Sequence, residues 1–547
     1  MHDSDAVAPD TVSQPSVSER IGYGLLFGAL TAIVVRALTY VANLLAGLAF
    51  PPFSLFDFMT RILPGTVVTA SIDTIVKVIR GLQLGSTATM AKLVEQSIAL
   101  LLFIFLGALF GSLLGILSRG ESPSRLPAYG LGIGLLIGVL VLGAELYVGV
   151  TTVGIAVSLV WLAIVFGGWG LVLGTLLGNA LAVSSQVARG EMARRNLLLT
   201  GGTALAAIIA GGLGLGFLMR ERRSSRPPQP VPTPSSTETS GAAAAPPQTA
   251  LSQRIDPVTG TRSEITPSDD FYRIDINTLP PDISADGWHL EIDGLVDQPA
   301  AMTLQDLREW PAVSQYITLS CISNPVGGDL ISTALWTGVR LKDLLEQIGL
   351  QADARALRIE AQDGFYETVV MDDLMDERTL LVYAMNGELL PQEHGFPLRI
   401  YIPNRYGMKQ PKWIVRMTAV ADEPPGYWVD RGWSRTAIMQ TTSVIDAVQV
   451  ESDGNGGVEI GGIAHAGDRG ISRVEVQIDD GTWQEAELRA PPLSPLTWVQ
   501  WRIADYNVTP GHHVAKVRAY DGSGDLQIAE PSPPHPNGAT GIDTYTF

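Results

Sequence analysis

Long runs of apolar residues fill much of the first 220 positions and set this part of the chain apart from the rest. Five runs are long enough to cross about 30 Å of hydrocarbon as helices. They cover residues 21–48, 98–117, 126–147, 154–183 and 197–219. The pattern therefore predicts an N-terminal α-helical transmembrane bundle of about five helices over residues 1–220, surrounded by membrane lipid.

The stretch 51–96, between the first two runs, mixes apolar residues with charged ones. Its charged residues include Asp57, Arg61, Asp73, Lys77 and Arg80. We expect a loop there with an amphipathic segment at 71–82. A re-entrant segment is the alternative.

Arginine residues next to the runs indicate how the bundle is oriented. They are Arg20, Arg119, Arg125, Arg189, Arg194 and Arg195. With five spans they fall on one side, which the positive-inside rule assigns to the cytoplasm. We therefore expect a multi-pass protein of the cell membrane whose catalytic part lies on the extracytoplasmic side. Four arginines after the last run oppose this orientation, namely Arg220, Arg222, Arg223 and Arg226.

The pair Arg194 and Arg195 precedes a weakly hydrophobic run rich in Gly and Ala. It resembles a twin-arginine export signal placed inside the chain, the route taken by domains that fold around a cofactor before export. An ordinary positive-inside pair is the alternative.

Beyond the bundle, composition and periodicity change twice. Residues 221–255 are rich in Pro, Ser, Thr, Ala and Gln, which predicts a disordered linker. Residues 256–440 alternate strand-like with helical pieces, which predicts a mixed α+β domain. The expected strands are 288–292 and 398–402, and the expected helices are 304–309 and 341–348.

The C-terminal part, residues 441–547, shows strand patterns only. Residues 474–478 alternate, Asp479-Asp480-Gly481 supplies a turn, and 513–520 alternate again. This pattern favours an immunoglobulin-like β-sandwich.

Composition narrows the class of protein. A mean hydropathy of +0.21 with 17% charged residues fits a membrane part joined to soluble parts. The net charge is -18, and most acidic residues lie beyond Asp256. An acidic soluble part argues against nucleic acid as a partner.

Cys321 is the single cysteine of the chain. It excludes an intramolecular disulfide, a Cys-rich zinc or iron–sulfur site and C-x-x-C-H haem attachment. No histidine lies between His2 and His289, so the bundle lacks the axial ligands of a membrane cytochrome b. We assign the bundle the role of an anchor, and exchange of electrons with quinone stays open.

The residues around Cys321 suit a metal bound at the end of a strand. A β-like run leads into Cys321, and Gly327 and Gly328 follow in a loop where backbone can approach a bulky ligand. The loop leads to Trp336-Thr337-Gly338-Val339-Arg340-Leu341. Here the chain resembles the sulfite oxidase family of molybdopterin enzymes, in which the cysteine sulfur binds molybdenum.

Three further segments carry the resemblance, at 383–391, 394–399 and 406–413. The family uses the His and Arg of its H-G-x-P-x-R segment, and basic positions near its Lys-Trp, to hold the pterin and its phosphate. The resemblance therefore implies cofactor binding by His394, Arg399, Lys409 and Lys412, whose fixed donors suit a phosphate and a pterin edge.

Four more residues match the family's pattern. Arg273, in an opening Phe-Tyr-Arg segment, corresponds to a residue of the molybdenum pocket, and Tyr427 to the pocket tyrosine. Asp363 resembles the acidic pterin contact, and Asn324, in the cysteine loop, is a further candidate for cofactor binding. The family also ends in a sandwich domain that usually mediates dimerisation, so a homodimer through residues 441–547 is expected.

Two departures bear on the substrate. Sulfite-oxidising members carry an Arg soon after the Cys-x-x-Asn segment and a His two positions past the opening Arg, whereas this chain has Pro325-Val326 and Asp275. An anionic substrate such as sulfite would lack those charges. With no haem attachment motif, the electron partner is expected to be a separate carrier protein or quinone.

The resemblance implies oxygen-atom transfer on a small or sulfur-containing substrate, as an oxidase or an oxide reductase, at a molybdenum held by one pterin dithiolene and Cys321. Two alternatives stay open. One is an enzyme that uses Cys321 as nucleophile and His394 as base. The other is a membrane-tethered binding module without catalysis.

Overall fold

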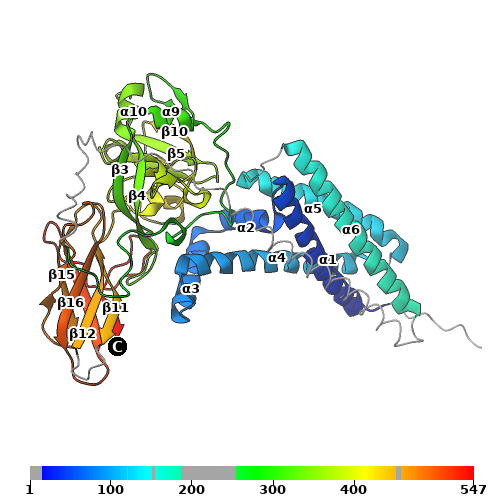
Figure 1. The fold of residues 1–547 in the computed structure, drawn as a ribbon. Coiled ribbons are helices and arrows are strands. Elements are labelled where there is room, and N and C mark those ends of the chain that lie inside the picture. The colour runs from blue at the N-terminus through cyan, green and yellow to red at the C-terminus, as the bar shows by residue number, and fades with distance from the viewer. Residues whose placement is uncertain (1–14, 120, 151–153, 187–253, 451–456) are drawn as a thin grey trace, which may run out of the picture. The chain divides into compact units, whose positions relative to one another are not determined.

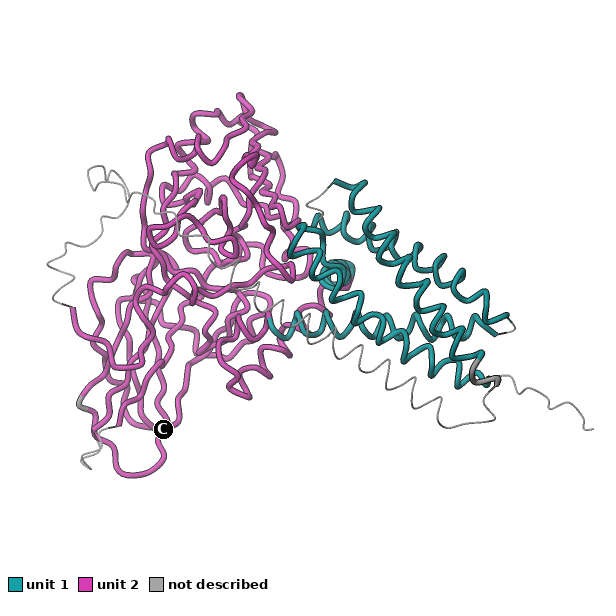
Figure 2. The backbone as a smooth tube through the Cα atoms, turned by 45° about the vertical axis from the view of Figure 1, so that its right-hand side comes forward, with its two compact units in different colours: residues 1–62, 93–227 teal, residues 63–92, 228–547 magenta. Residues whose placement is uncertain are grey.

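The computed structural model describes residues 15–119, 121–150, 154–186, 254–450 and 457–547. The chain divides into two compact units, which Figure 2 colours separately. Unit 1 is Met1–Ile62 with Leu93–Pro227, and unit 2 is Leu63–Lys92 with Pro228–Phe547. The segment Leu63–Lys92, which hydropathy groups with the anchor, thus clusters with residues of the soluble part.

The described part of unit 1 is helical (Figure 1). Its helices are α1 (Val17–Ala46), α2 (Pro51–Ile62), α4 (Thr87–Leu117, of which Leu93 onward belongs to this unit), the 3₁₀ turn η1 (Pro123–Arg125), α5 (Leu126–Val148) and α6 (Ile155–Gln186). Four helices of the described chain, α1, α4, α5 and α6, are long and apolar enough to cross a membrane. The number rises to five if α2 and α3 (Gly65–Gly81) together count as one broken span.

These helices confirm the first four predicted runs. The fifth run, 197–219, lies outside the described residues, as do Arg194, Arg195 and the linker up to residue 253. The expected amphipathic segment 71–82 is confirmed as the greater part of α3.

Glycines let neighbouring helices of unit 1 approach until their backbones touch. A Cβ atom added to Gly130 of α5 would lie 2.0 Å from the carbonyl oxygen of Gly170 on α6, and the reverse distance is also 2.0 Å. Gly24 of α1 and Gly111 of α4 are related in the same way, at 2.2 and 2.0 Å. Small residues at such crossings allow the close packing that holds helices together in lipid.

Two sheets form the mixed domain of unit 2. The first has the order β2-β1-β10-β5-β6, with β1 and β10 parallel and the other pairs antiparallel. Its strands are β1 (Leu290–Gly294), β2 (Ala300–Met302), β5 (Ala356–Ala361), β6 (Tyr366–Val370) and β10 (Ile414–Val420). The second has the order β3-β4-β7-β8 with β9 paired to β7, and its strands are β3 (Val313–Ser320), β4 (Ile331–Arg340), β7 (Leu380–Met385), β8 (Glu388–Leu389) and β9 (Arg399–Tyr401).

Short helices complete this domain. They are α9 (Leu304–Glu309), α10 (Leu341–Ile348), α11 (Met371–Leu374) and the 3₁₀ turns η2 (Ser268–Asp270), η3 (Gln392–His394), η4 (Gly407–Lys409) and η5 (Val429–Arg431). Both predicted helices are confirmed with their bounds. The α9 helix begins at a capping box in which Thr303 and Asp306 bond each other's backbone N–H.

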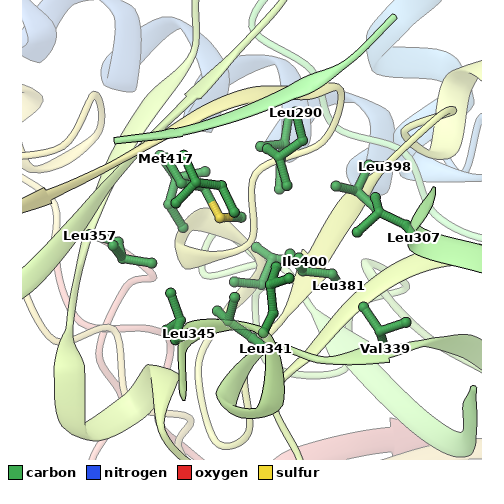
Figure 3. Packing of buried hydrophobic residues seen from close by; sticks show 14 of the residues in the cluster. Leu290, Leu307, Val339, Leu341, Leu345, Leu357, Leu381, Leu398, Ile400 and Met417 are labelled. Atoms are coloured by element: carbon green, nitrogen blue, oxygen red, sulfur yellow. The ribbon is translucent and has the colours of Figure 1, made fainter. Parts of the chain in front are cut away.

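One apolar cluster joins the two sheets to the helices (Figure 3). Leu341 and Leu345 of α10 contribute to it together with Leu290 of β1, Leu381 of β7 and Met417 of β10. All five side chains are fully buried. The core therefore packs the two sheets against each other and against the short helices.

The C-terminal part of unit 2 contains two antiparallel four-stranded sheets. One has the order β11-β12-β16-β15 (Thr442–Val450, Gly457–His465, Val499–Asn507 and Glu487–Leu488), and the other β14-β13-β17-β18 (Gln484–Glu485, Ile471–Ile478, Val514–Asp521 and Asp543–Thr546). Val476, Trp501 and Val517 belong to one buried cluster that draws on both sheets. The alternating patterns at 474–478 and 513–520 are confirmed as strands.

The helix crossing at Gly130 yields a testable prediction. We expect Gly130→Leu to destabilise the detergent-solubilised protein by about 1–3 kcal/mol, because the new side chain meets the backbone of α6. Gly132→Leu is the matched control, since no atom lies within 4 Å of a Cβ at that exposed position. Thermal unfolding measures both, and equal stability of the two variants would contradict the close α5–α6 packing.

Candidate functional site

Cys321 directly follows β3, the strand that ends at Ser320. Its backbone N–H donates to the carbonyl of Leu330 at 2.9 Å, and its own carbonyl accepts from the N–H of Asn324 at 3.1 Å. The sulfur lies 2.9 Å from Oγ of Ser323. These bonds fix the thiol at the start of the short loop that joins β3 to β4.

Glycine makes that loop possible. The side-chain oxygen of Asn324 accepts from the N–H of Leu330 at 2.9 Å, across the loop. A Cβ at Gly328 would lie 2.2 Å from this oxygen, and Gly327 has a φ of 67°, a conformation that L side chains rarely adopt. The Gly-Gly pair seen in the sequence is therefore a steric requirement of the loop, and the Asn324 side chain holds the loop closed.

Burial raises the pKa of the Cys321 thiol, and its hydrogen bonds with Ser323 offset this only in part. The thiol is therefore protonated at neutral pH as long as no cation binds it. This state is unsuited to nucleophilic catalysis, which needs a thiolate. A bound metal cation reverses the preference, because a coordinating thiol loses its proton.

Basic side chains gather around Asp275. Its carboxylate pairs with Nε of Arg273 at 2.5 Å and with Nζ of Lys412. The Lys412 amine also donates to the carbonyl of Glu393 at 3.0 Å and lies 4.4 Å from the ring centroid of Trp413. We call Arg273, Asp275, Lys412, Arg399 and His394 the cation cluster.

Arg399 links this cluster to the cysteine. Its guanidinium donates to the carbonyl of His394 at 3.1 Å and lies 4.8 Å from the ring centroid of Trp336. Tyr272 is close enough to both Arg399 and Cys321 for their charges to act on its pKa, which burial raises. Tyr272 thus lies within electrostatic range of both Cys321 and Arg399, although the three residues come from separate segments of the chain.

Asp275, Lys412 and Arg399 are largely enclosed, while the Arg273 side chain is 27% exposed. Burial raises the pKa of Asp275, but Lys412, Lys92 and Arg273 outweigh this and hold the pKa well below its usual range. Burial lowers the pKa of Arg399 to about 10 and also lowers that of Lys412. Among the described residues, Asp275 is the carboxylate that pairs with Arg273 and Lys412.

His394 is neutral at physiological pH. Burial, together with Lys412 and Arg399, lowers its pKa to about 3. Its Nε2 lies 2.9 Å from the carbonyl of Ser268, so Nε2 carries the proton and donates it. Phe271 packs edge-on against the ring at 5.5 Å. The imidazole is thereby fixed as a hydrogen-bonding group that does not add charge.

This set of residues fits a molybdenum–pterin cofactor. Arg273, Lys412 and Arg399 outnumber Asp275 by two charges, which matches the charge of about -1.5 to -2 on a phosphate monoester. Among the described residues no three His, Cys, Asp or Glu side chains gather as a metal site. A metal beside Cys321 would take the other ligands from the cofactor.

Asp363 has local contacts. Its carbonyl accepts from the side-chain amide of Asn277 at 3.3 Å, and its carboxylate accepts from the N–H of Phe365 at 2.9 Å. The cation cluster thus brings the predicted residues Arg273, His394, Arg399 and Lys412 together, while cofactor binding by Asp363 stays a prediction.

Two predicted site residues have other contacts. The amine of Lys409 donates to Glu367 at 2.7 Å and to the carbonyl of Thr368 at 3.3 Å, so its charge is matched inside the domain. Tyr427 packs against the rings of Phe365 and Tyr366 and lies 3.6 Å below the guanidinium of Arg431. Cofactor binding by Lys409 and a catalytic role for Tyr427 stay predictions.

Three residues of the site were not among the predicted ones. Tyr272 adjoins Arg273 in the opening segment, and Asp275 follows it by two residues, so their proximity could have been found from the motif. Lys92 acts on Asp275 from far upstream in the chain, and its local sequence gives no signal of this.

The model of the oxidoreductase molybdopterin-binding domain matches residues 277–428. Rat mitochondrial sulfite oxidase is 32% identical over 289 residues, which are 44% of this chain and 53% of that protein. The uncharacterised oxidoreductase YuiH of Bacillus subtilis is 33% identical over 27% of this chain and 72% of its own length. A putative protein-methionine-sulfoxide reductase subunit, YedZ1 of Azospira oryzae, is 30% identical over 28% of this chain and 56% of its own length.

The fold and the site define a molybdopterin-binding oxidoreductase domain. The chain belongs to the sulfite oxidase family of molybdopterin-dependent oxidoreductases, whose cofactor is molybdenum bound to molybdopterin. It spans about half the length of the mammalian sulfite oxidases that it matches.

The neutral state of His394 yields a prediction for cofactor-free protein. The folded pKa lies below the unfolded one, so this residue's stability contribution is complete above about pH 6.5 and is lost toward pH 3, at about 1.4 kcal/mol per pH unit. We expect His394→Gln to lose less thermal stability than wild type between about pH 7 and about pH 5. His289→Gln, at an exposed position, is the control and should follow wild type.

Burial also lowers the pKa of His465 to about 4. This residue changes stability with pH equally in all three proteins, so its effect cancels in the comparison. Parallel melting curves for His394→Gln and wild type across this pH range would contradict a neutral His394.

Proposed function

We propose that this chain is a membrane-anchored molybdopterin-dependent oxidoreductase that transfers an oxygen atom to or from a small substrate, with the metal bound by Cys321. The observation that carries the proposal is a cation cluster whose surplus charge suits a phosphate, together with the hydrogen bond from the N–H of Tyr272, next to Arg273, to Oγ of Ser332, which pairs with the strand that leads into Cys321. The bound cofactor supplies the two-electron chemistry.

The residues of this chain position that cofactor and shield it from water. Cys321 provides the thiolate ligand from a loop that Asn324 and Gly328 hold rigid. Arg273, Lys412 and Arg399 bind the phosphate and pterin edge. The neutral ring of His394 donates from Nε2 to the carbonyl of Ser268, which leaves Nδ1 as an acceptor. Because these groups are locked by neighbouring bonds, little reorganisation is needed during the reaction.

The setting is proposed from the sequence pattern and the family. Four apolar helices support a membrane anchor, and the arginine distribution favours a catalytic domain on the extracytoplasmic side of the cell membrane. The proposed domains are the membrane anchor at 1–220, the linker at 221–255, the molybdopterin-binding catalytic domain at 256–440 and the β-sandwich at 441–547. The two C-terminal sheets are proposed to form an immunoglobulin-like sandwich that mediates a homodimer, and an external carrier or quinone exchanges the electrons.

Uncharged oxides suit this site better than sulfite. Asp275 occupies the position where sulfite-oxidising members carry a histidine, and Val326 stands near the place of an arginine. The Arg273 side chain is already paired with Asp275, so part of the charge that an anionic substrate needs is used within the protein. We therefore propose an S-oxide or N-oxide as substrate.

The first prediction concerns the metal. Protein from a host that makes the pterin should contain about one molybdenum per chain, and Cys321→Ser should abolish turnover while thermal unfolding stays unchanged. Ser323→Ala is the control, because it alters the neighbouring hydroxyl and keeps the thiol. Elemental analysis, pterin fluorescence and turnover are measured on each protein.

Full activity in loaded Cys321→Ser would show that the metal-ligand assignment is wrong. Wild type without molybdenum would leave the two alternatives. Inactivation of metal-free protein by alkylation would then support the cysteine nucleophile, and no activity at all would support the binding module.

The second prediction concerns the substrate. Reduction of dimethyl sulfoxide or trimethylamine N-oxide by a reduced viologen should be faster than oxidation of sulfite with ferricyanide, because Asp275 already pairs with Arg273 and leaves that guanidinium less available to an anionic substrate. Loaded wild type and Cys321→Ser are compared in both assays. Faster sulfite oxidation in wild type would overturn the preference for uncharged oxides and leave the cofactor assignment intact.

A further inference from the structure

The segment Leu63–Lys92 contacts both sides of the site, although it lies outside the region matched by the family model. It belongs to the same compact unit as residues 228–547, as Figure 2 shows. Its first half is α3, and it ends in the opening turns of α4. This segment is called the upstream segment below.

Two contacts join the upstream segment to the cysteine loop. The guanidinium of Arg80 donates to the carbonyl of Gly327 at 3.3 Å. The backbone N–H of Thr87 donates to the carboxylate of Asp329 at 2.7 Å. Both acceptors lie within eight residues of Cys321, in the loop that fixes the thiol. The upstream segment therefore supports the metal side of the site.

A third contact reaches the cation cluster. The amine of Lys92 donates to the carbonyl of Asn277 at 2.8 Å. Its charge also acts on the buried carboxylate of Asp275, second only to Lys412 among the neighbouring charges that lower the pKa of that group. Arg273 and Lys412 thus pair with Asp275, and Lys92 contacts the backbone two residues further along the chain.

We propose that Lys92 is a cofactor-site residue, which binds an oxyanion together with Arg273 and Lys412 and so makes the upstream segment part of the catalytic unit. The ligand chemistry is a phosphate-like group, either the phosphate of the pterin cofactor or a free oxyanion. If the phosphate group is that of the pterin cofactor, the proposal rests on the proposed function.

The charge balance supports an oxyanion at this place. Arg273, Lys412 and Arg399 already exceed Asp275 by two positive charges in a buried setting, where unmatched charge is costly. Lys92 adds a further positive field at Asp275. Several donors converging on one region bind phosphate more firmly than a single lysine does, because each forms a charge-assisted hydrogen bond.

The test uses full-length protein in detergent and three variants. Lys92→Met removes the charge, Lys92→Arg keeps it, and Lys77→Met is the matched control because it removes the same charge from an exposed position of α3. Loss of pterin from loaded protein is followed by fluorescence at fixed ionic strength. Stabilisation of cofactor-free protein by inorganic phosphate is followed by thermal shift.

We expect Lys92→Met to release pterin about tenfold faster than wild type, the loss that corresponds to one charge-assisted hydrogen bond. Lys77→Met should behave as wild type and Lys92→Arg should restore most of the retention. If Lys92→Met keeps its pterin but needs about tenfold more phosphate for the same thermal shift, the subsite is supported and its ligand is a free oxyanion.

Unchanged pterin retention and unchanged phosphate stabilisation in folded Lys92→Met would overturn the proposal. Wild type that never binds pterin would instead contradict the proposed function, and the phosphate experiment would still decide the role of Lys92. The two failures are therefore distinguishable.

Discussion

Buried positive charge around Asp275 is the constraint on which the site depends. Arg273 and Lys412 both pair with this one carboxylate, and Arg399 is enclosed beside them. Such an arrangement is costly unless an anion completes it, because burial penalises unmatched charge. A bound phosphate group would supply the missing negative charge.

The two sheets and their core bring these charges together. Cys321 follows the end of β3 and Arg399 opens β9, in the sheet that β4 and β7 complete. Lys412 lies two residues before β10 of the other sheet. The shared apolar core packs the two sheets together (Figure 3), and Cys321, Arg399 and Lys412 lie at or near the ends of their strands. Stability of the core and chemistry of the site therefore depend on the same packing.

The local sequence pattern predicted the helices and the motifs. It could not predict which side chains from distant segments come together at the site. The bounds of α9 and α10 follow from caps and apolar spacing, and the strand before Cys321 follows from its apolar run. The direction of the Lys409 side chain depends on where β6 places Glu367, which no local signal encodes. The same holds for Lys92, which reaches Asp275 across more than 180 positions.

The central claim is that Cys321 binds molybdenum, and X-ray absorption at the molybdenum edge tests it most directly by counting sulfur ligands. Loaded wild type should show the two dithiolene sulfurs of one pterin and one additional sulfur. In Cys321→Ser that additional sulfur should be replaced by oxygen, with the pterin sulfurs unchanged. An identical sulfur count in wild type and Cys321→Ser would contradict the account.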